Sequence, residues 1–112
     1  MPAEDERARE AVTDQSRFRT ANNRLRRIVP SYGFKAGDRA PFICECADPG
    51  CFEAVMLSLE EYDRVRAESS WFVLVAGHED DEATYERVVE AERGYATVEK
   101  IGIAGAEAAR LG

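Results

Sequence analysis

The segment FICECADPGC, residues 42–51, places three cysteines within eight positions of a charge-rich chain of 112 residues. In its middle, Pro49 followed by Gly50 suits the two central positions of a type II turn. The stretches on either side, APFICECA and CFEAVMLSL, are rich in apolar residues and are bounded by turn residues, as strands are. The segment therefore predicts a β-hairpin with its cysteines gathered near the turn.

The cysteine spacing, C-x-C-x4-C, suggests a shared purpose for the three thiols. Side chains alternate between the two faces of a strand, so Cys44 and Cys46 are expected on one face and Glu45 on the other. After the turn the chain doubles back and brings Cys51 toward Cys46. Three thiolates at one end of a hairpin supply three corners of the tetrahedron that zinc prefers.

His78, the only histidine in the chain, is the natural fourth ligand. It directly follows the apolar run SWFVLVAG, which predicts a buried strand, and it precedes a predicted helix. A side chain at such a junction is readily aimed at a neighbouring hairpin. The expected site is a closed, structural zinc site with a Cys3His ligand set. Its predicted ligands are Cys44, Cys46, Cys51 and His78.

Other arrangements of the same site stay open at this point. A carboxylate could serve as a ligand or could accept a hydrogen bond from the imidazole. The candidates are Glu45, Glu53 and Glu79. A water molecule in the fourth position would instead make an open, catalytic zinc or iron site.

Two further interpretations of the cysteines need no structural metal. The thiols could be small core side chains, or they could form a redox switch that needs an exposed thiolate of low pKa. Core cysteines have no reason to cluster at a turn. Three clustered cysteines in a reducing compartment favour metal binding over a disulfide framework.

Residues 1–31 predict one long amphipathic helix. The stretch from Glu4 to Val29 has no glycine or proline, and Pro30 ends the helix. Apolar residues recur in it at three- and four-residue spacing, which is typical of a helix face that packs in a core or a dimer seam. These residues are Ala8, Ala11, Val12, Phe18, Ala21, Leu25, Ile28 and Val29.

The same helix carries most of its arginines after residue 15. They are Arg17, Arg19, Arg24, Arg26 and Arg27. The net charge of −7 makes contact with nucleic acid or an anionic membrane unfavourable. We therefore expect the arginines to pair with acids of the same or another subunit. The expected partners are a second copy, in a homodimer through this helix, or another protein.

The remaining elements follow from local signals. Ser58 and Glu61 form a capping box that opens a short helix. EDDEATYERVVEAER, residues 79–93, predicts a second helix because acids are favourable in a first turn, and YATVEKI predicts a strand. The expected fold is α+β, in the order helix-strand-strand-helix-strand-helix-strand, with a mostly antiparallel four-stranded sheet. Residues 32–100 would form the metal-binding core, and residues 101–112 a tail that is weakly helical or disordered.

Composition and motifs limit the function. The N-terminal MPAEDERARE has no apolar stretch and no window is long enough to span a membrane, so we expect a cytoplasmic protein. The chain has no phosphate-binding loop, G-x-S-x-G or H-E-x-x-H, and a single histidine leaves most acid–base mechanisms without a partner. A small zinc-binding module with a binding or regulatory role is favoured, and a metal-dependent enzyme or a thiol switch is the alternative.

Four stretches, FICECADPGC, LSLEEYDRVR, VAGHE and YATVEK, resemble a group of small uncharacterised bacterial proteins. These proteins share an arginine-bearing N-terminal helix, a C-x-C-x4-C stretch, an E-Y-x-x-V-R segment and a G-H-E motif. The resemblance covers most of the chain from Phe18 to Lys100. It implies no activity, but it supports the treatment of the cysteines and His78 as one constellation.

Overall fold

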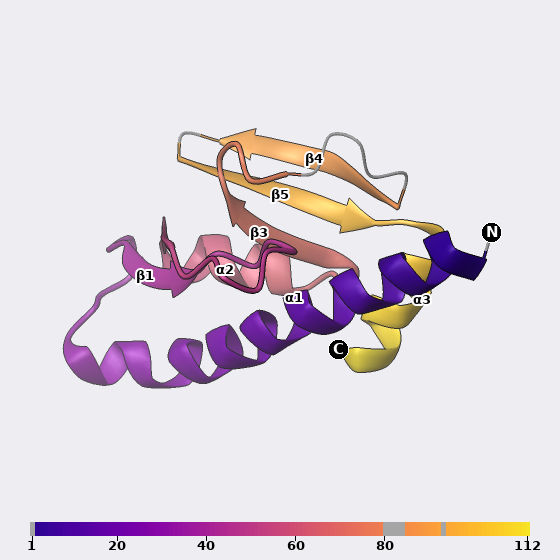
Figure 1. Ribbon diagram of the computed structural model, residues 1–112. Coiled ribbons are helices and arrows are strands. Elements are labelled where there is room, and N and C mark those ends of the chain that lie inside the picture. Colours follow the sequence, from indigo (N-terminus) through magenta and orange to yellow (C-terminus); the bar gives the residue numbers. More distant parts are fainter. Residues whose placement is uncertain (1, 80–84, 93) are drawn as a thin grey trace.

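A computed structural model describes residues 2–79, 85–92 and 94–112. A long helix lies along one side of the molecule and a three-stranded sheet along the other, with a β-hairpin and a short helix between them (Figure 1). The elements are α1 (Pro2–Ile28), the 3-10 helix η1 (Val29–Tyr32), β1 (Ala40–Ile43), β2 (Ala54–Leu57), α2 (Leu59–Arg66), β3 (Trp71–Val75), β4 (Glu86–Glu92), β5 (Tyr95–Lys100) and α3 (Gly102–Leu111).

The mixed α and β content, the long N-terminal helix and the antiparallel pairing are confirmed. The single four-stranded sheet is wrong, because the strands form one sheet of β1 and β2 and another in the order β3-β5-β4. The hairpin does not extend the larger sheet with a strand of its own. Instead, the loop after β1 reaches the free edge of β3, where the backbone N–H of Glu45 donates to the carbonyl of Val73 at 2.8 Å.

The helix predicted over residues 79–93 is also wrong in the part that the structure describes. Residues 86–92 form β4, which pairs antiparallel with β5 around a turn at Gly94. A bulge between Val88 and Glu90 interrupts the two-residue alternation of this strand. Residues 80–84 and 93 of the predicted helix lie outside the described residues.

Helix α1 ends where Pro30 predicts, but it turns a partly polar face inward. Its buried residues are Ala8, Val12, Gln15, Ser16, Arg19 and Asn22. Phe18 and Leu25 of the predicted stripe are only half-buried, and Ile28 is exposed. The C-terminal residues form α3, which packs against α1. No helix within the described ranges is long and apolar enough to cross a membrane.

The predicted capping box opens α2. The Ser58 hydroxyl accepts a hydrogen bond from the Glu61 backbone N–H at 3.1 Å, and the Glu61 carboxylate accepts one from the Ser58 N–H at 2.9 Å. This helix buries Tyr62, whose ring stacks on Phe42 of β1 at 4.5 Å between centroids. Helix α2 is thereby fixed against the hairpin that carries the cysteines.

Candidate metal centre

The three cysteines lie in the loop between β1 and β2, beyond the ends of both strands. One further backbone hydrogen bond, from Cys44 N–H to the Glu53 carbonyl at 2.9 Å, keeps the two sides of the loop together. The turn closes through Cys51 N–H and the Asp48 carbonyl at 3.0 Å. Gly50 does not have the positive φ that a type II turn requires, so that turn type is wrong. The Asp48 side chain holds the turn instead, by accepting from the Gly50 N–H at 2.9 Å.

The loop and the end of β3 bring all four predicted ligands together. One ligand atom from each of Cys44, Cys46, Cys51 and His78 lies within 4.8 Å of the others. The Nδ1 atom of His78 is 3.5 Å from the sulfur of Cys44 and 3.5 Å from that of Cys51. In a tetrahedral zinc site, Zn–S and Zn–N bonds of about 2.3 and 2.0–2.1 Å put sulfur and nitrogen about 3.6 Å apart. The predicted residues can therefore hold a metal ion.

A turn after β3 aims His78 at the sulfurs. Gly77 has a φ of 94°, a left-handed conformation that favours glycine. The backbone N–H of His78 donates to the Val75 carbonyl at 3.0 Å. The other ring nitrogen, Nε2, lies 2.7 Å from a carboxylate oxygen of Glu53, and that oxygen is also 4.0 Å from the sulfur of Cys51. If Nε2–H donates to this carboxylate, Nδ1 carries the free lone pair that a metal ligand requires.

The three candidate carboxylates thus have different positions. Glu53 holds the imidazole, and Glu79 accepts a hydrogen bond from the backbone N–H of Gly77 at 3.1 Å. Glu45 points away from the sulfurs and is paired with Arg66 at 2.6 Å. The face alternation expected around Glu45 is therefore present although its neighbours lie beyond the end of the strand.

All three thiols are buried; Cys51, the most accessible, is 8% exposed. Burial raises the pKa of Cys44 and of Cys46 above the ordinary thiol value. The sulfur of Cys44 also accepts a hydrogen bond from the Val75 backbone N–H at 3.2 Å. A metal that binds here must therefore displace protons from thiols, in a site whose geometry is already fixed by the backbone.

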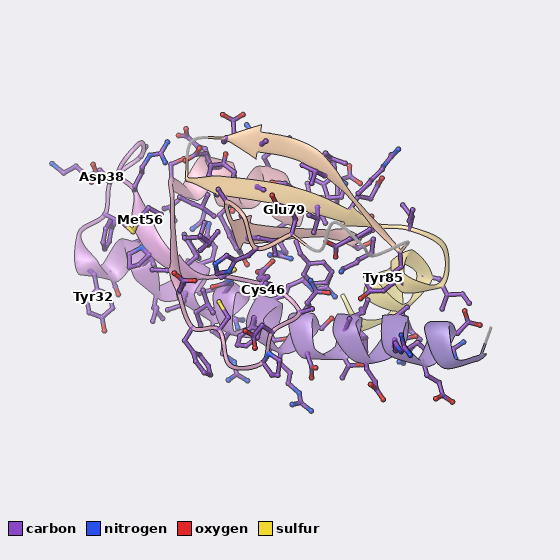
Figure 2. The ribbon with its side chains drawn as sticks, turned by 45° about the horizontal axis from the view of Figure 1, so that its top comes forward. Tyr32, Asp38, Cys46, Met56, Glu79 and Tyr85 are labelled. Carbon is purple, nitrogen blue, oxygen red and sulfur yellow. The ribbon has the colours of Figure 1, made fainter. Side chains whose placement is uncertain are left out.

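A surface pocket adjoins the cluster on one side. Its lining residues are Cys46, Ala47, Asp48, His78 and Glu79. Figure 2 shows Cys46 on the loop that lies between α1 and the three-stranded sheet, and Glu79 on the segment that follows β3. Two of the four predicted ligands, Cys46 and His78, therefore line a pocket at the surface.

The chain matches no protein-family model, no curated protein and no solved structure. Its function is therefore inferred from the chemistry of the four side chains and of the groups that hold them.

Proposed function

We propose that this protein binds one zinc ion in a closed, structural Cys3His site and acts as a small cytoplasmic binding or regulatory module. The observation that carries the proposal is the convergence of the four donor atoms within 4.8 Å. Thiolate sulfur together with imidazole nitrogen in tetrahedral arrangement is the donor set that suits zinc. Hard cations such as Mg²⁺ and Ca²⁺ prefer oxygen ligands.

A closed site is favoured over a catalytic one by the number of protein donors. Four protein ligands fill a tetrahedral sphere and leave no position for a substrate or a reactive water. The nearby carboxylates already have partners: Glu45 is paired with Arg66, and Glu53 with the proposed ligand His78. Glu53 lies 4.0 Å from the sulfur of Cys51, but its contact with His78 suits a group that orients the imidazole. A metal-dependent enzyme therefore ranks below the structural module.

A thiol switch ranks below it for a different reason. Reactive cysteines are exposed and have a lowered pKa. Here the thiols are buried, and burial raises the pKa of Cys44 and Cys46. A reducing cytoplasm would keep these thiols reduced and available for zinc.

The role that zinc has in this proposal is to tie two distant segments together. Cys44, Cys46 and Cys51 come from the loop of the hairpin, whereas His78 follows β3. In small proteins the apparent binding energy of a structural zinc is about 10–16 kcal/mol, comparable with the stability of a whole domain. Zinc bound here would hold the hairpin loop against the three-stranded sheet.

Elemental analysis of the purified protein tests the proposal. We expect one zinc per chain in the wild type, a reduced content in His78→Ala, and an unchanged content in Glu79→Gln, the matched control. The control changes a neighbour of His78 whose carboxylate binds the Gly77 backbone. Absence of metal from the wild type after expression with added zinc would overturn the proposal.

A homodimer through α1 is a separate proposal. Two residues of the expected seam have contacts within the chain, since Leu25 packs against the core and the Phe18 ring contacts Phe52 at 5.8 Å. Ile28 is 47% exposed and is the seam residue best placed to contact a second copy. Light scattering of wild type and Ile28→Glu tests this: a dimer that becomes monomeric supports it, and a monomeric wild type at high concentration refutes it.

A further inference from the structure

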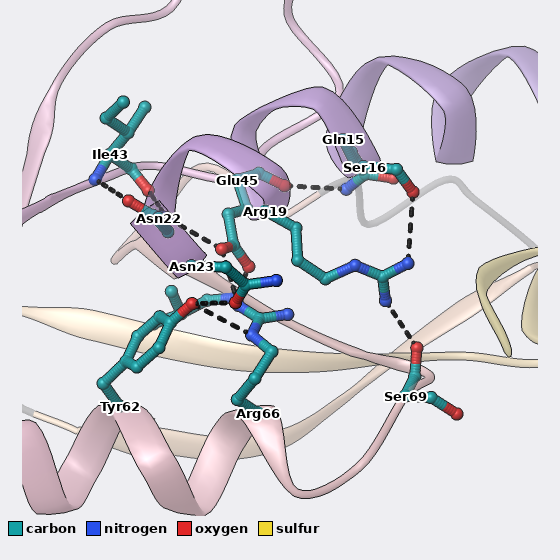
Figure 3. A network of polar contacts seen from close by, with 11 residues as sticks. Gln15, Ser16, Arg19, Asn22, Asn23, Ile43, Glu45, Tyr62, Arg66 and Ser69 are labelled. Carbon is teal, nitrogen blue, oxygen red and sulfur yellow. Dashed lines mark hydrogen bonds and ion pairs between the residues drawn. The ribbon is translucent and has the colours of Figure 1, made fainter. Parts of the chain in front are cut away.

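Glu45, between two candidate ligands, is at the centre of a buried polar network (Figure 3). Its side chain is fully buried. One carboxylate oxygen accepts hydrogen bonds from the guanidinium of Arg66 in α2 at 2.6 Å and from the side-chain amide of Asn22 in α1 at 2.7 Å. The other oxygen accepts from the backbone N–H of Val73 in β3 at 3.0 Å. One side chain thus joins three elements.

Side chains of helix α1 also form hydrogen bonds with the backbone of the segment that carries the ligands. The side chain of Asn22 accepts from the Ile43 N–H at 2.8 Å and donates to the Ile43 carbonyl at 2.8 Å. About two turns earlier, the amide of Gln15 donates to the Glu45 carbonyl at 3.0 Å. Residues 15 and 22 are seven positions apart and so lie on one face of the helix. The middle of α1 is thereby attached to residues 43–45, the start of the C-x-C stretch.

These contacts depend on where residues 43–45 lie. Buried polar groups that lose a partner cost about 1–3 kcal/mol each, so the network is favourable only while the segment keeps its position. Within the described residues, Gln15 Oε1 and Arg66 Nη1 have no hydrogen-bond partner, which leaves the network without surplus contacts. Any movement of Cys44 and Cys46 would move Glu45 between them.

We propose that Glu45 is a positioning residue that couples metal binding at the cysteines to the docking of α1. The inference rests on the metal site proposed above. A metal ion fixes Cys44 and Cys46, and these fix the Glu45 carboxylate and the adjacent backbone. The hydrogen-bond partners of Asn22 and Gln15 are then held in place, so the middle of α1 packs more tightly against residues 43–45. Without metal the segment is held by hydrogen bonds alone, and α1 opens more often.

Because coupling between two equilibria is reciprocal, the docked helix must raise metal affinity by the same factor. Breaking the network at Glu45 should therefore do two things together. It should lower zinc affinity, by about 5- to 150-fold if the coupling has the usual size, and it should remove the effect of zinc on α1. Substitution of a residue with only a structural role would speed amide exchange in α1 but would leave the effect of zinc on that exchange unchanged.

Hydrogen exchange of the full-length protein, with zinc and with a chelator, tests the proposal. In the wild type, zinc should slow amide exchange in residues 11–28 more than in β4, the internal reference. Glu45→Gln retains the shape of the side chain but not its charge, and the zinc-dependent slowing in residues 11–28 should be lost at saturating zinc. Zinc affinity, measured by competition with a chromophoric chelator, should fall in the same variant.

The matched control is Arg19→Gln. Arg19 donates to the Ser69 carbonyl at 2.6 Å and the Ala108 carbonyl at 2.9 Å, which anchor α1 outside the segment that carries the ligands. In this variant the amides of residues 11–28 should exchange faster both with zinc and with chelator, but zinc should still slow their exchange as in the wild type. Should Glu45→Gln not fold, Asn22→Ser removes the same link from the α1 side and is expected to behave like it.

The outcomes separate the two proposals. A wild type that binds no metal removes the metal site and the coupling together. A wild type that binds zinc in the cysteine cluster but shows unchanged exchange in residues 11–28 overturns the coupling and leaves the metal site standing. Equal zinc-dependent slowing in the wild type and in Glu45→Gln also overturns it, because Glu45 would then not transmit the effect.

Discussion

Glu53 contacts the His78 ring at Nε2, and the sulfurs of Cys44 and Cys51 contact it at Nδ1. The carboxylate lies 2.7 Å from Nε2, and the sulfurs of Cys44 and Cys51 lie 3.5 Å from Nδ1. Hydrogen-bonded carboxylates of this kind orient a metal-binding imidazole and increase its basicity. In the proposed zinc site Glu53 is therefore the group that prepares His78 as a ligand, although its own side chain is 61% exposed.

The first prediction follows from this contact. Glu53→Ala should retain all four ligands but weaken zinc binding by about 10- to 100-fold, the usual effect of losing such a partner. Competition with a chromophoric chelator measures the change. Glu68→Ala, which removes an exposed carboxylate outside the candidate site, is the control and should bind like the wild type. Equal affinity of Glu53→Ala and wild type would show that the carboxylate does not assist the imidazole.

The second prediction concerns pH and the metal-free protein. Burial raises the pKa of Cys44 and Cys46 in the folded state, so above the ordinary thiol pKa of about 8.5 the folded chain holds more protons than the unfolded chain. The stabilisation that this difference gives is complete below that pH and is lost as the pH rises. The free energy of unfolding of the chelated protein should therefore fall between about pH 8.5 and 10.

The zinc-bound protein should show the opposite trend at lower pH. Zinc holds deprotonated sulfurs, so folding with zinc releases protons that the unfolded thiols hold below about pH 8.5. Its stability should rise with pH up to that point, by up to about 1.4 kcal/mol per pH unit for each proton released. Denaturant unfolding across pH 6.5–10, with and without chelator, measures both curves. Parallel curves would contradict thiolate ligation.

The third prediction removes a ligand. Cys46→Ser should lose zinc and melt at the temperature of the chelated wild type, because both proteins lack the metal link between the hairpin loop and His78. Zinc in thousandfold excess over its Kd would stabilise the wild type by about 4 kcal/mol. Thermal unfolding of the two proteins, each with zinc and with chelator, measures the shift. A wild type that melts at the same temperature after chelation would refute the structural role.

The fourth prediction concerns the helix contact alone. In the metal-free protein, Asn22→Ala should lower the free energy of unfolding by about 1–3 kcal/mol or more, because it leaves the buried groups of Ile43 and Glu45 without partners. Thr20→Ala, an exposed position on the same helix, should change it by less than about 0.5 kcal/mol. Denaturant unfolding compares them, and similar losses in both variants would mean that the amide of Asn22 contributes nothing specific.

Much of the fold and the ligand set could be predicted because local signals carry it. Pro30 ends α1, the capping box opens α2, and the apolar run over residues 71–75 forms β3. The four candidate ligands stand out because their residue types are rare in this chain and the spacing of the cysteines is unusual. The elements and the cysteine spacing depend on residues close together in sequence, whereas the approach of His78 to the cysteines depends on the fold.

The missed features depend on contacts between distant residues. Strand β4 begins after a run of acids, and its apolar residues are interrupted by a bulge, so its sequence is typical of a helix although β5 pairs with it. The polar face of α1 was missed because Asn22 and Gln15 are usually exposed. Only the fold reveals that they meet the backbone beside Glu45. The one available signal was Glu45 itself, a charged residue between two candidate ligands.

X-ray absorption at the zinc K-edge of the zinc-loaded protein is the most direct test of the central claim. The account predicts three sulfur neighbours at about 2.3 Å and one nitrogen at about 2.0–2.1 Å, with one sulfur lost in Cys51→Ser and the nitrogen lost or replaced in His78→Ala. A shell of oxygen and nitrogen atoms without sulfur in the wild type would contradict it.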